Sequence, residues 1–281
     1  MTDAPLRCVT CDAPLSGPFC ANCGEKRIAA DDLSFKHFFE HALEAFTHLD
    51  GKVFATVRAL VGTPGQLTAD YFRGRRKPYL APLHLFLVIN LLCFLLMPLL
   101  HWNTFTTPLY THMNQQPYSL KATAAVQAKL QASGESLDAY SARFDHSASI
   151  AARSLLILLV PLFSVPVALL YWRRRYLESV IYSMHFCAAL ILIMIAVMGA
   201  FDIAVLLLRP FHVRIPPEVL DLGSGFADML VSVVYLHRSL GRTFPGPQWL
   251  TGVRALVLAL LLFPVIQLYR SALFLVAFWS T

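Results

Sequence analysis

Four cysteines near the start of the chain occur in two closely spaced pairs. They are Cys8 and Cys11, then Cys20 and Cys23, so each pair has the spacing Cys-x-x-Cys. Each pair places two thiolates on one tight turn, and two such turns complete the four-thiolate tetrahedron that Zn²⁺ prefers. A segment this short has no hydrophobic core of its own, so the metal would supply most of its folding free energy. We therefore predict a structural Zn²⁺ site in a zinc ribbon over residues 1–30.

Other uses of four cysteines fit this pattern less well. A c-type haem site needs a His directly after Cys-x-x-Cys, and neither pair has one. A rubredoxin-like iron site uses a similar ligand set, but the loop between the pairs is short for the surrounding fold. Disulfides are disfavoured in the reducing cytosol, where the charge distribution described below places this segment. Four thiolates leave no open coordination position, so we expect no metal catalysis.

A basic block precedes the first long apolar stretch. Its four basic residues are flanked by Tyr71 and Tyr79, and they are Arg73, Arg75, Arg76 and Lys77. Beside a membrane, such a block can bind anionic lipid headgroups, with about 1 kcal/mol from each basic residue. It can equally be an ordinary positively charged anchor with aromatic residues at the interface. Both interpretations stay open.

Polar and charged side chains also interrupt the apolar stretches. The main ones are His185, Asp202, Asp228 and Arg270. Charged groups inside a bilayer are costly, so they usually face a partner or water. They predict either a path for a solute or protons, or an ion pair between Asp202 and Arg270 that locks the helices together.

No catalytic motif accompanies these residues. The sequence lacks Gly-x-Ser-x-Gly, His-Glu-x-x-His and glycine-rich nucleotide loops in a plausible setting. His101, His112 and His146 are spaced too irregularly to predict a metal site. We therefore assign no catalytic residue and expect no enzymatic activity.

The elements that must position these residues are membrane helices. Of 281 residues, 57% are hydrophobic and 14% are charged, whereas soluble domains are about a quarter charged. A helix that crosses a hydrocarbon core needs ~20 mostly apolar residues. Over residues 81–281 we predict an all-α polytopic bundle of about five spans, at about 82–100, 150–172, 180–208, 220–236 and 253–279. The fourth is the weakest, because it is short and contains Asp228.

The basic residues of the loops predict an orientation. With the N-terminus inside, most Lys and Arg residues fall on the cytoplasmic side, chiefly in residues 1–79 and 173–175. By the positive-inside rule, this predicts a multi-pass protein with a cytoplasmic N-terminus. The same asymmetry accounts for the net charge of +6. Membrane lipids are therefore expected partners, and nucleic acid is not.

Two further segments flank the first predicted span. In the juxtamembrane segment, residues 31–80, apolar residues recur at three- and four-residue spacing over 33–49 and again over 53–61. This spacing predicts amphipathic helices that lie among lipid headgroups or pack beneath the bundle. Residues 101–149 predict an external segment, either a small lid or a long connection. Ser119 and Ser136 are its candidate helix N-caps.

The order of these features resembles a known family. Its elements here are the ribbon ending Phe19-Cys20-Ala21-Asn22-Cys23-Gly24-Glu25, then Thr56, Leu60 and Pro64-Gly65, and a Tyr-x-x-Gly-x-Arg-x-x-Tyr-x-x-Pro block from Tyr71 to Pro82. Over roughly residues 8–100, the chain resembles an uncharacterised bacterial family of multispan membrane proteins, a domain of unknown function with a zinc ribbon. The resemblance implies a location in the bacterial inner membrane. It implies no particular activity.

Two classes of function remain. The first is a membrane-anchored interaction or scaffold module whose ribbon binds a protein partner at the inner leaflet. The alternative is a transporter or channel-like bundle for a small solute or lipid. The ribbon favours the first class, because four-cysteine ribbons commonly act as recognition modules, and the charges within the spans favour the second. The sequence predicts neither the partner nor the oligomeric state.

Overall fold

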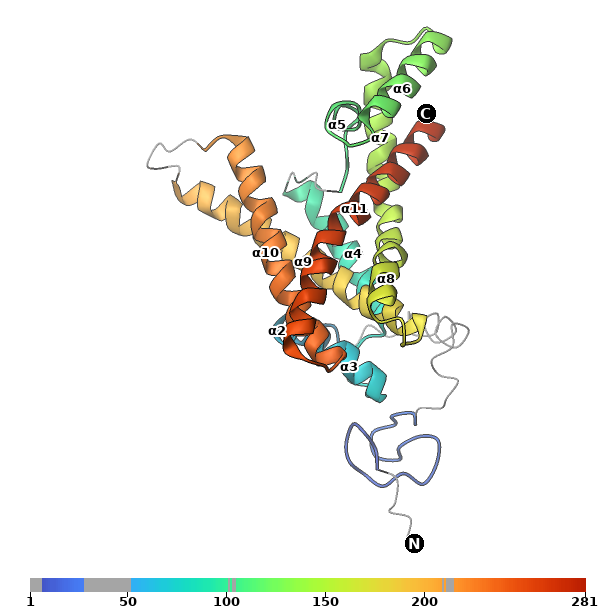
Figure 1. Ribbon diagram of the computed structural model, residues 1–281, viewed down its shortest axis with the longest axis vertical. Coiled ribbons are helices and arrows are strands. Elements are labelled where there is room, and N and C mark those ends of the chain that lie inside the picture. Colours follow the sequence, from blue (N-terminus) through green and yellow to red (C-terminus); the bar gives the residue numbers. More distant parts are fainter. Residues whose placement is uncertain (1–6, 28–51, 101, 103–104, 209, 211–214) are drawn as a thin grey trace. The chain divides into compact units, whose positions relative to one another are not determined.

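The computed structural model describes residues 7–27, 52–100, 102, 105–208, 210 and 215–281. Throughout this part of the chain the regular elements are helices, alongside two isolated bridges, Arg7 with Pro14 and Phe19 with Lys26. The helices, shown in Figure 1, are α2 (Lys52–Gly62), α3 (Gln66–Arg73), α4 (Pro82–Leu99), α5 (Leu109–Asn114), α6 (Ser119–Ser133), α7 (Leu137–Leu155), the 3₁₀ turn η3 (Leu156–Leu158), α8 (Leu159–Leu170), α9 (Tyr176–Leu208), α10 (Pro217–Thr243) and α11 (Gln248–Ser280). The all-α prediction is confirmed, whereas the amphipathic helix expected over 33–49 lies outside the described residues.

Three of these helices are long and apolar enough to cross a membrane. They are α9, α10 from Val219 and α11, and only 6% of the most apolar window of α9 is buried within the protein. A fourth crossing is available if Leu137–Ala152 and Leu156–Leu170, bent by 55°, form one broken span. The first predicted span corresponds to a shorter apolar helix, Pro82–Met97. These helices indicate a membrane protein with three or four candidate spans, against the five predicted.

Two helices begin or end away from the predicted positions. The weak fourth stretch, expected over 220–236, is a longer helix, because Pro216 stands at its N-cap and the helical backbone continues to Thr243. The second stretch, expected over 150–172, starts inside α7 and is interrupted by η3. The polar residues of α7 therefore belong to the same helix as the first apolar residues of the predicted span.

The described helices divide into two compact units. Unit 1 comprises Met1–Ile89 and Val167–Ala259, and unit 2 comprises Asn90–Pro166 and Leu260–Thr281. The boundaries between the units fall within α4, α8 and α11, so each of these helices belongs partly to unit 1 and partly to unit 2. The two Cys-x-x-Cys pairs and the basic block belong to unit 1.

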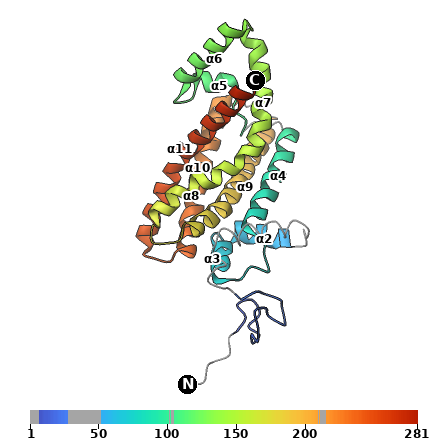
Figure 2. The ribbon, with the colours of Figure 1, turned by 90° about the vertical axis from the view of Figure 1, so that its right-hand side faces the viewer.

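Unit 1 is organised around the antiparallel pair α9 and α10. The short helices α2 and α3 lie across one end of this pair, as Figure 2 shows, and α3 contacts both long helices. Hydrogen bonds hold the α2–α3 hairpin (Lys52–Arg73) in place: Tyr235 Oη donates to the Leu60 carbonyl at 3.0 Å, and Arg242 donates to the Pro64 carbonyl at 2.8 Å. The hairpin is therefore fixed to the end of a candidate membrane span.

Unit 2 contains the segment predicted to be external. Its helices α5, α6 and α7 pack with the last turns of α11 (Figures 1 and 2) around a core of Leu109, Ala122, Val126, Tyr140, Phe144, Ala148, Ala152, Leu273, Phe274 and Ala277. Ser136 caps α7 as predicted, its hydroxyl accepting from the Ala139 amide. Ser119 is instead the first residue of α6. The segment thus has a hydrophobic core that it shares with the end of α11.

A histidine lies inside this core. His112 is fully buried, with Nδ1 2.8 Å from the Tyr118 hydroxyl and with the rings of Phe144 and Phe274 at 5.7 and 5.3 Å. Burial, together with the positive charge of Arg270, lowers the pKa of His112 to about 4. The imidazole is therefore neutral at physiological pH.

Unit 2 should lose stability as the pH falls from about 6.5 to about 4. The unfolded chain binds a proton at His112 near pH 6.5, whereas the folded chain does so only near 4. Acid therefore favours the unfolded state by up to about 3 kcal/mol, and this contribution to stability is fully present above about pH 6.5. Thermal unfolding of the detergent-solubilised protein at several pH values measures the loss. The His112→Phe variant should show a shallower pH dependence, and an unchanged one would contradict the assignment.

Candidate metal centre and juxtamembrane site

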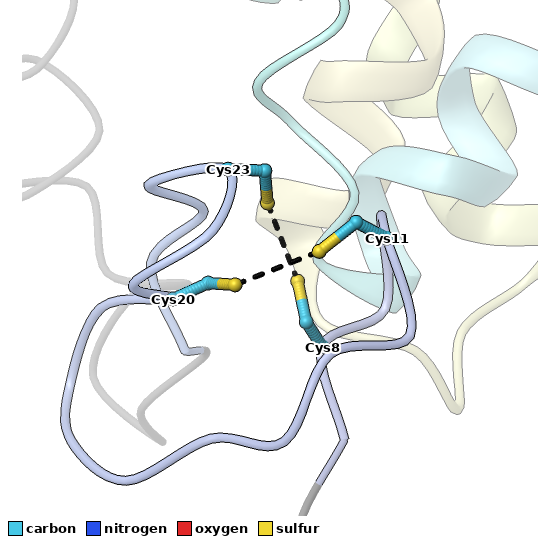
Figure 3. Close-up of side chains that lie close together, drawn as sticks. All are labelled: Cys8, Cys11, Cys20 and Cys23. Carbon is cyan, nitrogen blue, oxygen red and sulfur yellow. Dashed lines mark hydrogen bonds between the residues drawn. The ribbon is translucent and has the colours of Figure 1, made fainter.

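The four cysteine side chains point toward a common centre, as Figure 3 shows. Their Sγ atoms all lie within 4.8 Å of one another. Two Sγ pairs, Cys8 with Cys23 and Cys11 with Cys20, are 3.5 and 3.6 Å apart. Thiolates bound to Zn²⁺ at about 2.3 Å would lie about 3.8 Å from one another, and none of the four forms a disulfide. The donor set and its spacing fit a tetrahedral metal ion held by all four cysteines.

Both cysteine pairs lie on the same backbone turn. In the first, the Asp12 amide donates to the Cys8 carbonyl at 2.9 Å, and the Cys8 amide donates to the Ala13 carbonyl at 2.8 Å. In the second, the amides of Gly24 and Cys20 make the equivalent bonds, at 2.7 and 2.9 Å. The residue that follows the second cysteine of each pair has a left-handed backbone conformation, with φ of 61° at Asp12 and 69° at Gly24. Glycine adopts this conformation freely, so Gly24 suits the left-handed position of the second turn.

The same turns aim backbone amides at the sulfur atoms. Hydrogen bonds, first from the backbone of Cys23, lower the pKa of the Cys20 thiol to about 6, and the backbone of Ala13 lowers the pKa of Cys11. The Glu25 backbone acts in the same direction on Cys23, but burial and the neighbouring thiols raise its pKa to about 12. Crowded thiols resist full ionisation unless a cation joins them, and a bound divalent cation supplies that charge.

A buried carboxylate joins the four-cysteine segment (residues 7–27) to the basic block. Glu25 is 5% exposed, and its Oε2 accepts hydrogen bonds from Thr10 Oγ1 at 2.7 Å and from the Lys77 amide at 3.0 Å. The Lys77 Nζ donates to the Cys23 carbonyl. The side chain of Glu25 therefore connects both cysteine turns with the residues that precede α4.

Replacing Glu25 with Ala should loosen this connection without removing the metal. The change leaves the Thr10 hydroxyl and the Lys77 amide without their acceptor, and hydrogen bonds to a charged group contribute about 1.5–3 kcal/mol each. We expect hydrogen exchange of the four-cysteine segment to rise about tenfold or more at unchanged zinc content. Glu25→Gln keeps an acceptor oxygen and should restore slow exchange. Equally slow exchange in Glu25→Ala would contradict the role.

The basic block surrounds a second buried carboxylate. Asp70 accepts a hydrogen bond from Gln66 Nε2 at 2.7 Å and one from the Tyr79 hydroxyl at 3.3 Å. Arg75 and Arg73 approach its carboxylate oxygens to 3.9 and 4.0 Å. A buried charge is tolerated only when it is paired and hydrogen-bonded, and Asp70 is both. Burial and the charge of Asp70 raise the pKa of Tyr79.

The remaining members of the basic block also have intramolecular contacts. Arg76 lies over the Tyr71 ring, with its guanidinium carbon 4.3 Å from the ring centroid, and Lys77 contacts the four-cysteine segment. The Nε atoms of Arg75 and Arg76 are nevertheless buried without a hydrogen-bond partner among the described residues. Anion binding by the block stays a prediction. The block also has a structural role, because its side chains contact Asp70, Tyr71 and the four-cysteine segment.

In the turn between α2 and α3, the main chain packs directly against the main chain of α10. Gly65 has φ of +82°, and a Cβ placed there would lie 2.4 Å from the carbonyl oxygen of Ser239 and 2.8 Å from its Cα. One turn later, the Thr68 hydroxyl lies 2.9 Å from His185 Nδ1. Both side chains are buried, so this polar contact joins α3 to α9. His185, predicted as an intramembrane polar residue, is therefore paired with the juxtamembrane hairpin.

The other polar residues predicted within spans are dispersed. Asp202 lies on α9 in unit 1 and Arg270 on α11 in unit 2, so their proposed pairing stays a prediction. Asp228 lies within α10, and its Oδ1 is buried without a hydrogen-bond partner in the described part of the chain. Arg270 lies close enough to His112 for its charge to act on that ring.

One part of the chain matches a known family. Residues 50–94 match a family described as "Protein of unknown function (DUF3667)". The match covers the α2–α3 hairpin, the basic block and most of α4, and it does not include the cysteine pairs. No curated protein and no solved structure matches the chain.

Several residues of this site carried no recognisable signal in the sequence. Asp70 and Thr68 are single polar residues in a short helix. Their partners Tyr79 and His185 were noticed in the sequence for other reasons, and no pattern there pairs them with Asp70 and Thr68. Glu25 did carry a signal, because it closes the Phe-Cys-x-x-Cys-Gly-Glu motif. Its place in the motif does not reveal that its carboxylate accepts a hydrogen bond from the Lys77 amide.

Proposed function

We propose that this chain is a membrane-anchored interaction module, in which a structural zinc ribbon binds a protein partner at the cytoplasmic face of the inner membrane. The observation that carries the proposal is the chain of contacts from the four-cysteine segment to the membrane helices. Glu25 connects the segment to Lys77, and the α2–α3 hairpin connects the adjoining residues to α9 and α10. A recognition surface held in this way keeps a defined position relative to the bilayer.

The four-cysteine segment exposes apolar side chains that it does not need for its own fold. Val9, between the first two cysteines, is 55% exposed, and Phe19, just before the third, is 58% exposed. Exposed aromatic and aliphatic side chains on a small rigid unit are the usual anchors of protein interfaces. Each lies next to a cysteine, so the metal would fix the position of both.

The donor set supports the proposal of zinc. Four thiolates in a closed tetrahedral arrangement favour Zn²⁺, which has no redox chemistry and is usually four-coordinate in structural sites. The residues that would hold it are Cys8, Cys11, Cys20 and Cys23. The ion would supply folding free energy and rigidity to the segment. The cytoplasmic location is supported by the clustering of basic residues in unit 1, at Arg73–Lys77, 173–175, Arg238 and Arg242.

Site-specific photo-crosslinking in living cells tests the proposal. A photoreactive phenylalanine at position 9 or 19 should give the same discrete protein adduct, whereas one at the exposed Leu120 of unit 2 should not. The adduct should disappear in Cys8→Ser, which removes a metal ligand. It should also weaken in a Phe19→Ser variant that retains zinc. No adduct at either position, or the same adduct in Cys8→Ser, would overturn the proposal.

A further inference from the structure

Helix α2 presents an apolar face that the described part of the chain leaves uncovered. Phe54 is 76% exposed and Val61 is 58% exposed, while Thr56 and Leu60 on the opposite side are buried. Arg58 lies on the exposed side, one turn after Phe54. An exposed helical face that combines large apolar residues with a basic one is typical of helices at a membrane interface.

The exposed side of α2 borders an open groove. Its wall on the helix is formed by Phe54, Arg58 and Gly62 at successive four-residue intervals, and its opposite wall by Pro78 and Tyr79. Gly62 has no side chain to fill the groove, and a Cβ placed there would meet nothing within 4 Å. The groove has a volume of about 640 Å³. This volume accommodates a lipid headgroup and the first part of its chains.

The groove lies at the boundary of a candidate membrane span. Leu60 and Gly65, at the end of α2 and just after it, contact the last turns of α10 through Tyr235 and Thr243. Helix α10, a candidate span from Val219, ends at Thr243, and its last turns carry Arg238 and Arg242. The groove therefore opens at the level where lipid headgroups meet the hydrocarbon core, so a phospholipid is the molecule most abundant beside it.

The charges of the groove favour an anion. Among the described residues that line the groove, Arg58 is the only basic one and none is acidic. The Tyr79 hydroxyl donates to Asp70, so the face of its ring rather than its oxygen is available to a ligand. Asp70 itself is buried and paired with Arg73 and Arg75. An anionic headgroup can therefore approach Arg58 without meeting an unpaired carboxylate among these residues.

We infer that this groove is a binding site for an anionic phospholipid. The phosphate accepts charge-assisted hydrogen bonds from the Arg58 guanidinium, and the acyl chains pack against Phe54 and the Tyr79 ring. Gly62 allows the headgroup to approach the helix. The site is separate from the four-cysteine segment, so it does not depend on the protein partner proposed above.

Retention of lipids by the full chain tests this inference. The protein is reconstituted in phosphatidylcholine vesicles that contain phosphatidylglycerol as a minor component, extracted in mild detergent, and analysed for bound lipid by native mass spectrometry. The wild type should retain phosphatidylglycerol in preference to phosphatidylcholine. Arg58→Gln should reduce this preference about fivefold, the equivalent of about 1 kcal/mol for one basic residue near a membrane surface. Arg238→Gln, which changes an exposed arginine outside the groove, should leave the preference unchanged.

A second variant tests the shape of the groove independently of its charge. Gly62→Leu places a side chain in the groove, and its Cβ would meet nothing within 4 Å, so it should reduce retention of both lipids. Gly225→Leu on α10, where a Cβ also meets nothing within 4 Å, should not. Equal loss of phosphatidylglycerol in Arg58→Gln and Arg238→Gln would overturn the inference, since it would show a diffuse surface charge effect. Displacement of the lipid by soluble glycerol phosphate at equal concentration would also overturn it, in favour of a site for a free phosphate ester.

Discussion

The full chain purified in detergent should carry about one zinc ion, and Cys20→Ser should remove it. The four Sγ atoms already lie within 4.8 Å of one another. Replacing one thiolate in a four-thiolate shell leaves an incomplete tetrahedron, and the folding free energy of so short a segment depends on the metal. We expect zinc content to fall from about one per chain to near zero, measured by inductively coupled plasma mass spectrometry after dialysis.

The chain provides its own controls for this experiment. Cys93 and Cys187 are buried in apolar helices and are far from the cysteine pairs in sequence. Serine at either position should leave the zinc content unchanged. Retention of zinc in Cys20→Ser, or iron in place of zinc in the wild type, would contradict the assignment. The same experiment on Cys8→Ser, from the other turn, should repeat the loss.

Gly65→Ala should destabilise unit 1 more than any other single-methyl change in the hairpin. The added Cβ would lie 2.4 Å from the Ser239 carbonyl oxygen, and Gly65 has a left-handed backbone. The conformational penalty is about 1–2 kcal/mol, and overpacking against a main chain costs about 1–3 kcal/mol. We expect a loss of about 3 kcal/mol in total. A lower midpoint of thermal unfolding and faster hydrogen exchange in α3 would report it.

The matched control is three residues away. A Cβ at Gly62 would meet nothing within 4 Å, and this position lies at the end of a regular helix. Gly62→Ala should therefore leave the unfolding midpoint unchanged or raise it slightly, since alanine is the better helix former. Equal behaviour of the two variants would mean that the hairpin does not pack against α10 as described.

The cysteine cluster could be predicted from the sequence because its geometry is local. Within each pair, two intervening residues set the separation of the thiolates, and Gly24 marks the left-handed position. The apolar stretches were equally visible, because membrane helices need long runs of hydrophobic residues. Their number and limits were harder to predict, since a 3₁₀ break such as η3 (Leu156–Leu158) lies within an uninterrupted run of hydrophobic residues.

The polar contacts that hold the hairpin could not be predicted, because they join residues far apart in the chain. Thr68 and His185 are separated by 117 positions, and Leu60 and Tyr235 by 175. Neither pair has a spacing that a periodic pattern reveals. His185 was recognised as costly within a span, but its partner lies on a helix outside the predicted spans. Tertiary packing, and not local pattern, determines where such a residue finds its hydrogen bond.

The contact at Gly65 has a consequence for the genetics of this chain. The obstacle to a larger residue there is the carbonyl oxygen, Cα and carbonyl carbon of Ser239, all of them main-chain atoms. Every amino acid at position 239 would present the same atoms. A suppressor of Gly65→Ala should therefore not arise at position 239, and should instead map to residues that let α10 or the hairpin shift as a whole.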